Sequence, residues 1–196
     1  MDLYPALPSR ALAPGARLCR PALSGPEATA ESPALSVMTD LTRIAPVVIS
    51  ADTTMEWANT YMIQRGVRML FAMHADGTLA GIVTATDILG EKPVELVHQE
   101  RVRYADIRVS DVMTPAARIE VLDYARVERS QVGHVVSTMQ AARRHHALVV
   151  QQDAQGRTEI RGIFSLSQVA RQLGMPLQLP QEVETFSEIE AAIGAA

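Results

Sequence analysis

The chain has 196 residues, of which 47% are hydrophobic but only 4% aromatic, so its core must be mainly aliphatic. The formal net charge of −4 argues against a non-specific nucleic-acid binder, and the single cysteine, Cys19, excludes an internal disulfide and a cysteine zinc cluster. No stretch approaches the roughly 20 apolar residues of a membrane helix, and prolines interrupt the apolar windows near the N-terminus. We therefore expect a cytoplasmic protein with no targeting signal, no membrane association and no nucleic-acid partner.

Residues 1–34 form a segment rich in Pro, Ala, Ser and Gly, which cannot bury enough surface to fold alone. Large apolar side chains are nevertheless spaced along it, more than a plain linker requires. The sequence predicts an extended arm that is either disordered or docked on the folded body or on a second subunit through residues 3–18. The apolar side chains concerned are Leu3, Tyr4, Leu7, Leu12 and Leu18.

The next stretch contains alternating signals for strands and helices. Thr53 and Glu56 have the spacing of a capping box, which predicts a helix that ends near Gly66. Two apolar runs then flank the turn signal at residues 74–77 and predict a hairpin, whose second strand continues into a helix. The elements expected here are a strand at 46–49, the helix up to Gly66, a hairpin over 67–83 and a helix up to residue 89.

After a polar connector with alternating charges, the same order of elements returns. We expect a strand at 119–122, a helix that starts at Ser130, hairpin strands at 147–150 and 162–164, and a final helix that ends at Gly174. Thr185 and Glu188 then form another capping-box pattern, which predicts a short tail helix through Ile193.

Matching residues show that the two stretches are an internal repeat. Ser-Val-Met-Thr at 36–39 matches Asp-Val-Met-Thr at 111–114, and Gly81 matches Gly162. The second copy is longer in its hairpin loop, at 153–159, and insertions confined to loops are typical of two copies of one fold. A unit this small buries little surface alone, so the copies should pack together.

The repeated Val-Met-Thr, the strand-helix-strand-strand-helix unit and the closing Gly-hydrophobic-hydrophobic-Thr/Ser-x-x-Asp pattern resemble a pair of CBS domains, the tandem called a Bateman module. The resemblance implies an α+β fold in which two β-α-β-β-α motifs pack as a pseudo-twofold pair of small sheets flanked by helices. The expected organisation is an arm (1–34), CBS motif 1 (35–93), a connector (94–108), CBS motif 2 (109–174) and a tail (175–196).

The resemblance also implies function. Many relatives bind adenosine-containing ligands such as AMP, ADP, ATP or S-adenosylmethionine in clefts between the two sheets. The family is typically regulatory and not catalytic, and two modules commonly assemble into a flat homodimer. We therefore expect a homodimeric, non-enzymatic regulator that requires no cofactor, binds an AMP-like ligand and signals to an unidentified protein partner. The alternative is a ligand-free pair that acts as a dimerisation and docking scaffold.

The first strand-to-helix corner, at residues 81–89, is the strongest candidate site. Free N–H groups at the start of a helix suit a phosphate, and the hydroxyls of Thr84 and Thr86 can add hydrogen bonds. Asp87 matches the family residue that accepts hydrogen bonds from both ribose hydroxyls. The resemblance adds the motif glycine and three side chains that would enclose adenine: Gly81, Ile44, Val67 and Met69.

A structural interpretation of the corners needs no ligand. Thr84 and Asp87 have capping-box spacing, as do Ser165 and Gln168 in the second copy. Gln168 is neutral where the family pattern has Asp, so it would accept from a ribose less strongly. A ligand is favoured at the first corner and a plain helix cap at the second.

A basic cluster, Arg143-Arg144-His145-His146, precedes the second hairpin, where basic residues of some relatives contact phosphates. Adjacent residues on a strand face opposite sides, so His145 and His146 are not expected to serve one ligand together or to form a metal pair. The cluster is either a solvated rim or a phosphate site, and His146 or Arg144 could reach a phosphate bound at the first corner. No nucleophile, base and orienting group come together in the sequence.

Overall fold

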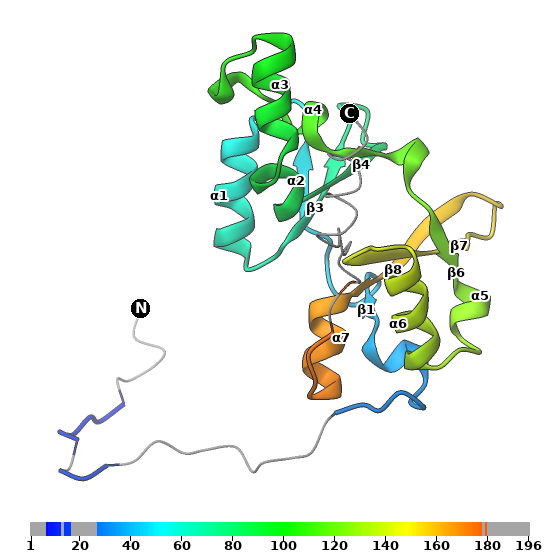
Figure 1. The fold of residues 1–196 in the computed structure, drawn as a ribbon. Helices are drawn as coiled ribbons and strands as arrows, with labels where there is room; N and C mark the ends of the chain where they lie inside the picture. Colours follow the sequence, from blue (N-terminus) through cyan, green and yellow to red (C-terminus); the bar gives the residue numbers. More distant parts are fainter. Residues whose placement is uncertain (1–6, 13, 17–26, 178, 180–196) are drawn as a thin grey trace, which may run out of the picture.

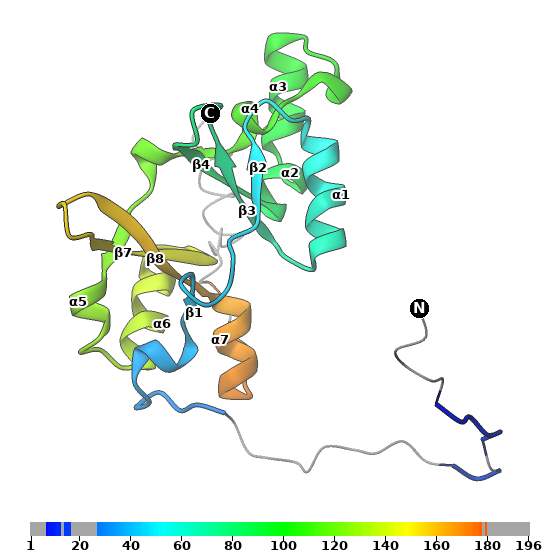
Figure 2. The same ribbon diagram turned by 180° about the vertical axis from the view of Figure 1, so that it is seen from behind.

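The computed structural model describes residues 7–12, 14–16, 27–177 and 179. It contains two four-stranded sheets that face each other, with the helices of each half on the far side of its sheet (Figures 1 and 2). The strands are β1 (Thr39–Asp40), β2 (Val48–Ser50), β3 (Met69–Met73), β4 (Leu79–Thr84), β5 (Thr114–Pro115), β6 (Val121–Asp123), β7 (His146–Gln152) and β8 (Thr158–Ser165).

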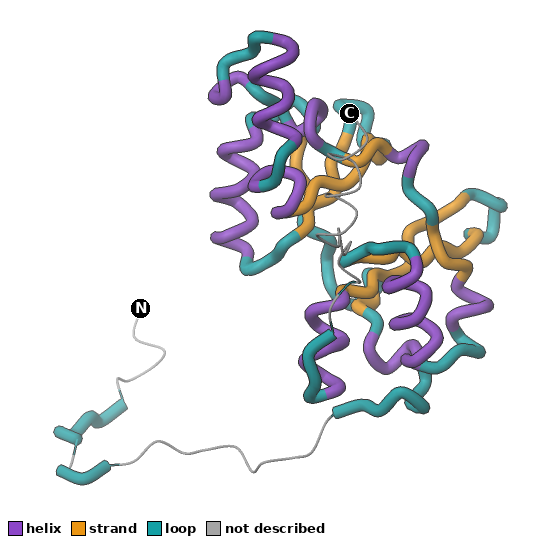
Figure 3. Tube along the Cα trace, viewed as in Figure 1, coloured by secondary structure: helices purple, strands orange, loops and turns teal. Residues whose placement is uncertain are grey.

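The helices separate into two groups, one for each sheet (Figure 3). They are α1 (Met55–Arg65), α2 (Ala85–Leu89), α3 (Lys92–Glu100), α4 (Val109–Val112), α5 (Tyr124–Val127), α6 (Val132–Ala141) and α7 (Leu166–Leu173), with 3-10 turns η1 (Ala34–Val37), η2 (Tyr104–Asp106) and η3 (Ala116–Arg118). The α+β fold with two repeated motifs is therefore confirmed. Within the described residues, none of the helices has the length and apolar character needed to cross a membrane.

The two sheets have equivalent strand orders, β2-β3-β4-β5 and β6-β7-β8-β1. In each, a parallel pair is followed by the predicted antiparallel hairpin. The fourth strand of each sheet, however, comes from the segment that leads into the other copy: β1 pairs with β8, and β5 pairs with β4. The two motifs therefore exchange their entry strands, which the repeat alone did not predict.

The matched glycines Gly81 and Gly162 lie where these exchanged strands cross. A Cβ atom on Gly81 would lie 2.3 Å from the carbonyl oxygen of Thr114, a distance no carbon can hold from a backbone atom. A Cβ atom on Gly162 would lie 2.5 Å from the Met38 sulfur, at the flexible end of a side chain. Close packing requires glycine at the first crossing, where the neighbour is rigid backbone, and favours it at the second, where the neighbour is a flexible side chain.

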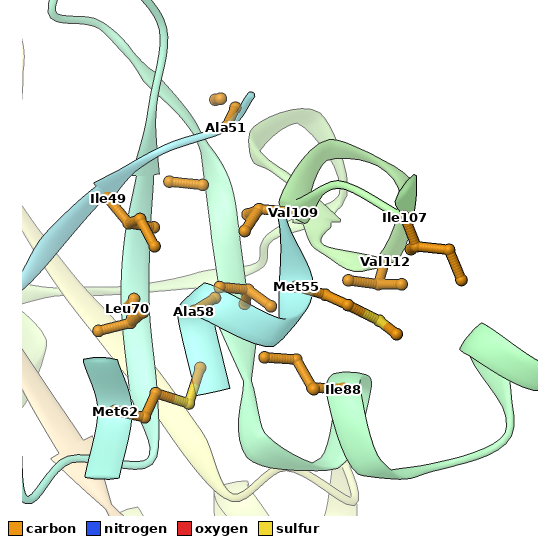
Figure 4. Packing of buried hydrophobic residues seen from close by; sticks show 13 residues of the cluster. Ile49, Ala51, Met55, Ala58, Met62, Leu70, Ile88, Ile107, Val109 and Val112 are labelled. Atoms are coloured by element: carbon orange, nitrogen blue, oxygen red, sulfur yellow. The ribbon is translucent and has the colours of Figure 1, made fainter. Parts of the chain in front are cut away.

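The core of the first half is formed by α1, α2 and α4 against their sheet (Figure 4). Met55, Ala58 and Met62 project from one face of α1, and each is at most 2% exposed. Burying a large side chain of this kind contributes about 1.5–3 kcal/mol. The remaining buried members of the cluster are Ile49, Ala51, Leu70, Ala72, Ala80, Val83, Ile88, Ile107, Val109 and Val112.

Helix α1 begins one residue later than the sequence indicated. Its N-cap is Thr54, whose hydroxyl accepts from the N–H of Trp57 at 3.4 Å, and the capping box from Thr53 to Glu56 is not formed. The carbonyl of Thr53 instead accepts from the N–H of Val109 at 2.8 Å, which holds residue 53 in an extended conformation. The C-terminal prediction is confirmed, because Gly66 ends the helix with a φ of 63°.

The core of the second half is formed by α6 and α7 against the other sheet. Val132, Val135 and Met139 are buried on one face of α6, as their helical spacing predicts. The N-cap of this helix is Gln131 and not Ser130, since the Ser130 carbonyl accepts from the N–H of Ala34 at 2.9 Å. The contact with Ala34, which is far from the helix in sequence, thus helps to determine where the helix starts.

The end of the N-terminal arm is part of this second half. The carbonyls of Ala30 and Ser32 accept from the N–H groups of Gly133 and Val132, each at 2.9 Å, and Ala28 is 5% exposed. Leu7 and Leu12 are instead 90% and 85% exposed, so these two side chains do not dock on the body of the chain. The other apolar residues of the predicted arm, Leu3, Tyr4 and Leu18, lie outside the described residues.

The expected connector is largely helical. Helix α3 starts at Lys92 and continues into the connector, and its Leu96 and Val97 pack against the first core. Alternating charges are therefore the exposed face of a docked helix and not a sign of an open linker. The tail helix predicted over residues 185–193 lies outside the described residues.

A third core joins the two halves. Met69 and Phe71 of β3 and Leu148 of β7 are each at most 7% exposed and pack together between the sheets. Ile82, Ile119 and Ile163 are partly buried against them. The inner faces of both sheets are therefore apolar in the middle, and the clefts described next lie beside this shared core.

Candidate functional site

The first strand-to-helix corner has the geometry of a full capping box. The hydroxyl of Thr84 accepts from the N–H of Asp87 at 3.2 Å, and Asp87 Oδ2 accepts from the Thr84 N–H at 2.9 Å. The same carboxylate oxygen accepts from the Thr84 hydroxyl at 2.7 Å. The structural interpretation of the corner is confirmed, and the carboxylate is held in a fixed orientation.

Lys92 completes the environment of Asp87. Its ammonium group donates to Asp87 Oδ1 and to the carbonyl oxygen of Val112 at 3.0 Å. The Asp87 side chain is only 13% exposed. Lys92 therefore ties the corner to the end of α4. The sequence did not predict this contact, because a lysine at the start of a connector belongs to no pattern that indicates its partner.

A cleft of about 260 Å³ opens directly beside this corner. One wall is the corner itself, and the other comes from the second half of the chain, so both copies of the repeat contribute to one cavity. The lining residues are Ile82, Thr84, Thr86, Asp87, Thr114, Arg118, Ile119, Glu120, Arg143, Arg144, His145, His146 and Leu148.

The apolar part of the cleft consists of Ile82, Ile119 and Leu148. Ile44, expected to enclose adenine here, is 57% exposed and does not line this cleft. Ile44 follows β1, which belongs to the second sheet, whereas Ile119 holds the equivalent place in the second copy and follows β5. The exchange of entry strands has thus moved Ile119 into the position predicted for Ile44.

The other residues proposed to surround adenine are also structural. Val67 packs against the first core, and Met69 lies in the core between the sheets. Gly81 is buried below the Thr114 carbonyl, where its role is to admit the crossing strand. None of the three lines the cleft.

Positive charge gathers among the residues that line the cleft. The guanidinium of Arg144 forms an ion pair with Glu120, with 2.8 Å between Nη2 and Oε2. The exposed side chain of Arg118 forms no hydrogen bond or ion pair with the described residues, and Arg143 also lines the cleft. Since both carboxylates of the cleft already have cationic partners, an anionic ligand would meet net positive charge.

His145 and His146 line the same cavity, which contradicts the expectation that they face opposite sides. Strand β7 begins at His146, so His145 lies before the strand, two residues after Arg143 with its left-handed φ of 50°. Strand alternation therefore does not apply to this pair. His146 and Arg144 line one cavity with the first corner, and their contact with a bound phosphate stays a prediction.

His146 is the most deeply placed of these basic residues. Its Nδ1 atom is buried and has no hydrogen-bond partner among the residues that the structure describes. Burial lowers the pKa of His146 to about 4, with the positive charges of His145 and Arg68 acting in the same direction and Asp87 opposing them. The imidazole is therefore neutral at pH 7, with an unsatisfied polar atom at the cleft.

A second pocket of about 360 Å³ adjoins the first. Four residues, Thr84, Thr86, His145 and His146, line both cavities. The remaining residues of the second pocket are Arg68, Ala85, Leu89, Gly90 and Ser167.

The second corner does not form the predicted cap. No side chain caps α7, and the Ser165 hydroxyl lies 3.1 Å from that of Ser167. Gln168 Oε1 accepts from the hydroxyl of Thr39 at 3.4 Å. Thr39 belongs to the exchanged strand β1, so the crossing strand offers Gln168 a partner that the local sequence does not contain.

A larger hollow, of about 630 Å³, is an outer groove between β6 and helices α5 and α6. It contains none of the ligand-binding residues predicted from the sequence, and its acidic residue Asp123 accepts from the N–H of Arg126 at 3.1 Å. Among the described residues, no group of three metal-ligating side chains is close enough to hold an ion. The cleft between the two copies is therefore the best candidate site.

Comparison with known proteins agrees with this architecture. Residues 36–93 match the CBS domain family, and no curated protein matches the chain in sequence. Residues 36–93 thus form a CBS domain, and the resemblance to CBS domains is confirmed.

Solved structures share the fold. One is a conserved protein from Pyrococcus horikoshii (TM-score 0.51, 21% identity, covering 77% of this chain and 98% of that one). A second is CBSX2 in complex with AMP (TM-score 0.50, 19% identity, covering 71% and 94%). A third is protein MJ1225 from Methanocaldococcus jannaschii (TM-score 0.51, 17% identity), where the match covers 71% of this chain and 49% of that one.

Proposed function

We propose that this protein is a regulatory module that binds an adenine nucleotide in the cleft beside Asp87 and signals its occupancy to a partner protein. The main support is that a carboxylate, hydroxyl groups, apolar side chains and cationic side chains from both copies line one cavity. A further support is the shared fold with CBSX2, which was solved in complex with AMP.

The lining suggests how a nucleoside would bind. Adenine would pack against Ile82 and Ile119, and a ribose hydroxyl would donate to Asp87 Oδ1 beside Lys92, since each carboxylate oxygen has two lone pairs. The capping box would then serve the ligand as well as the helix, because it fixes the carboxylate before binding.

The charge of the cleft favours phosphate over a sulfonium ligand. Arg118, Arg144 and His145 would attract the phosphate of AMP, ADP or ATP and would repel the positive sulfur of S-adenosylmethionine. An adenine nucleotide is therefore our first choice of ligand.

Signalling would arise from differential affinity. The cleft is built from both halves, so a bound nucleotide stabilises the arrangement in which the halves are closed around it. A partner that recognises this arrangement would sense the ligand. Ligand at about 100 times its Kd would add about 2.7 kcal/mol to the stability of the fold.

Isothermal titration of the full chain with AMP, ADP, ATP, NADH and S-adenosylmethionine tests the site. Asp87→Asn retains an oxygen that can cap α2 but removes the charge, and it should weaken nucleotide binding about tenfold. Gln168→Ala at the other corner is the matched control and should leave the affinity unchanged. Binding that is unaffected by Asp87→Asn would reject the site, and no binding of any compound would favour a ligand-free scaffold.

We also propose that the chain forms a homodimer through α1. Trp57 and Ile63 are 51% and 73% exposed, and Trp57 stacks on Tyr61 with 6.5 Å between ring centroids. Exposed large apolar side chains on one helix favour association. Sedimentation equilibrium should show a dimer that Trp57→Glu converts to a monomer, and a wild-type monomer would refute this proposal.

A further inference from the structure

We propose that Lys92 determines how the site holds a ribose. It leaves Asp87 able to accept a hydrogen bond from only one ribose hydroxyl, so that an adenine nucleotide without the other hydroxyl binds as tightly as AMP. This inference rests on the proposed nucleotide site and assigns a selectivity residue to it. It concerns the sugar of the ligand and not its phosphates.

The Asp87 carboxylate has few acceptor positions left. Oδ2 accepts from the N–H of Thr84 at 2.9 Å and from the Thr84 hydroxyl at 2.7 Å, while Oδ1 accepts from the ammonium group of Lys92. An ionised carboxylate offers about four lone-pair positions. The donors among the described residues therefore leave one position, on Oδ1.

The orientation of the carboxylate is fixed. The Asp87 side chain is largely buried, and its own N–H donates to the Thr84 hydroxyl at 3.2 Å. Turning the carboxylate to offer another position on Oδ2 would break the capping box of α2. A second ribose hydroxyl could therefore bond to Asp87 only if Lys92 gave up Oδ1.

Lys92 is itself held in place by further contacts. Its ammonium group also donates to the carbonyl oxygen of Val112 at 3.0 Å. Lys92 is the first residue of α3, and Leu96 and Val97 of this helix pack against the first core. Lys92 lines neither cavity, so it reaches Asp87 from outside the cleft and restricts the carboxylate without excluding a nucleotide.

Lysine is an exceptional residue in this chain. Lys and Arg together number 18, and Lys92 is the only lysine among them. A compact ammonium group has three donors and can bond to one carboxylate oxygen and to a separate carbonyl oxygen, whereas a planar guanidinium favours paired bonds to both oxygens of one carboxylate. The single lysine thus suits a contact that takes Oδ1 alone and also binds Val112.

The second copy of the repeat has no such contact. Helix α7 continues through Leu173, whereas α2 ends at Leu89 and the chain starts α3 at Lys92 (Figure 1). Gln168 holds the place of Asp87 and has Thr39 as its partner. The Lys92 bond is therefore a property of the first corner, where the ligand is proposed, and not a requirement of the repeated fold.

Isothermal titration of the full chain with AMP, 2′-deoxy-AMP and 3′-deoxy-AMP tests the inference. Wild-type protein should bind one of the two deoxynucleotides within about twofold of AMP, and the other about tenfold more weakly, because only one hydroxyl bonds to the charged carboxylate. Lys92→Met retains an unbranched stem but frees Oδ1. It should then bind AMP at least about fivefold more tightly than either deoxynucleotide, since the second hydroxyl gains an acceptor.

Arg101→Gln is the matched control. Arg101 is the cation at the other end of α3 and lines neither cavity, so this variant should show the wild-type ratios. Circular dichroism and the melting temperature of the unliganded variants show whether they fold. Lys92→Gln, which also lacks the ammonium group, replaces Lys92→Met if that variant does not fold.

The wild-type titrations alone can refute the inference. If both deoxynucleotides bind about tenfold more weakly than AMP, two hydroxyls contact the protein and the inference is wrong, although the nucleotide site stands. Equal binding of all three would also overturn it, because no hydroxyl would then contact Asp87. Wild-type ratios in folded Lys92→Met would show that Lys92 does not set them. Failure of every nucleotide to bind would instead reject the proposed function itself.

Discussion

The two strand-to-helix corners have nearly the same sequence pattern but use it differently. At the first, Thr84 and Asp87 cap each other's backbone and Lys92 joins them. At the second, Ser165 caps nothing and Gln168 contacts Thr39 of the exchanged strand. The comparison shows that a local pattern fixes which contacts are available, while the strand that crosses the corner decides which of them form.

Substitution of the glycines before the corners should produce the largest difference in the free energy of unfolding between the two copies. Gly81→Ala would push a Cβ atom against the rigid carbonyl of Thr114, and overpacking of this kind costs about 2–3 kcal/mol. Gly162→Ala meets only the Met38 side chain, which can move, so its cost should be smaller. Urea denaturation of both variants measures the two values, and equal destabilisation would show that the crossings are equally rigid.

The pH dependence of stability should distinguish His146 from Met69, because residues 143–146 of the second copy align with residues 66–69 of the first. The unfolded chain protonates His146 below a pKa of 6.5, whereas the folded protein does so only near 4. Stability is therefore full above pH 6.5 and falls as the pH decreases through this window, by about 2 kcal/mol between pH 7 and pH 5. His146→Gln should remove most of this dependence in urea denaturation at the two pH values.

The pKa of Asp40 lies outside that window. A hydrogen bond from Arg161, with one from Thr42, lowers the pKa of Asp40 to about 2. The stabilisation from Asp40 is thus present above pH 3.8 and is lost only as the pH falls further, towards 2. A pH dependence that persists unchanged in His146→Gln between pH 5 and pH 7 would contradict the assignment to His146.

Substitution of the corner side chains themselves should have the smallest effect on stability. Asp87→Ala removes a helix cap and the partner of Lys92, with an expected loss of about 1 kcal/mol, because the ion pair is partly exposed. Gln168→Ala removes one long hydrogen bond and should cost less than about 0.5 kcal/mol. Chemical denaturation of the two variants measures these losses of stability. A larger loss in Gln168→Ala would mean that the contact to β1 stabilises the fold more than the capping box does.

The sequence predicted the residues at the first corner but not their surroundings. Thr84, Thr86 and Asp87 line the cleft as expected, since they follow one another along the chain. Ile44 was placed there by its motif position, yet Ile119 occupies the site because β5 and not β1 joins the first sheet. The repeat did identify Ile119 as the residue that matches Ile44. Nothing in the local sequence, however, indicated which copy would provide the isoleucine of the cleft.

The sequence by itself determined the repeat, the hairpins, the main helices and the Thr84–Asp87 cap. Its hydrophobic periodicity, glycines and turn signals predict these features because each depends on neighbours within a few residues. Only the tertiary structure decided the strand exchange, the Lys92 bond to Asp87 and the meeting of Arg68 with His145 and His146. These contacts join residues far apart in sequence, or copies of the repeat, and depend on packing that the local pattern does not encode.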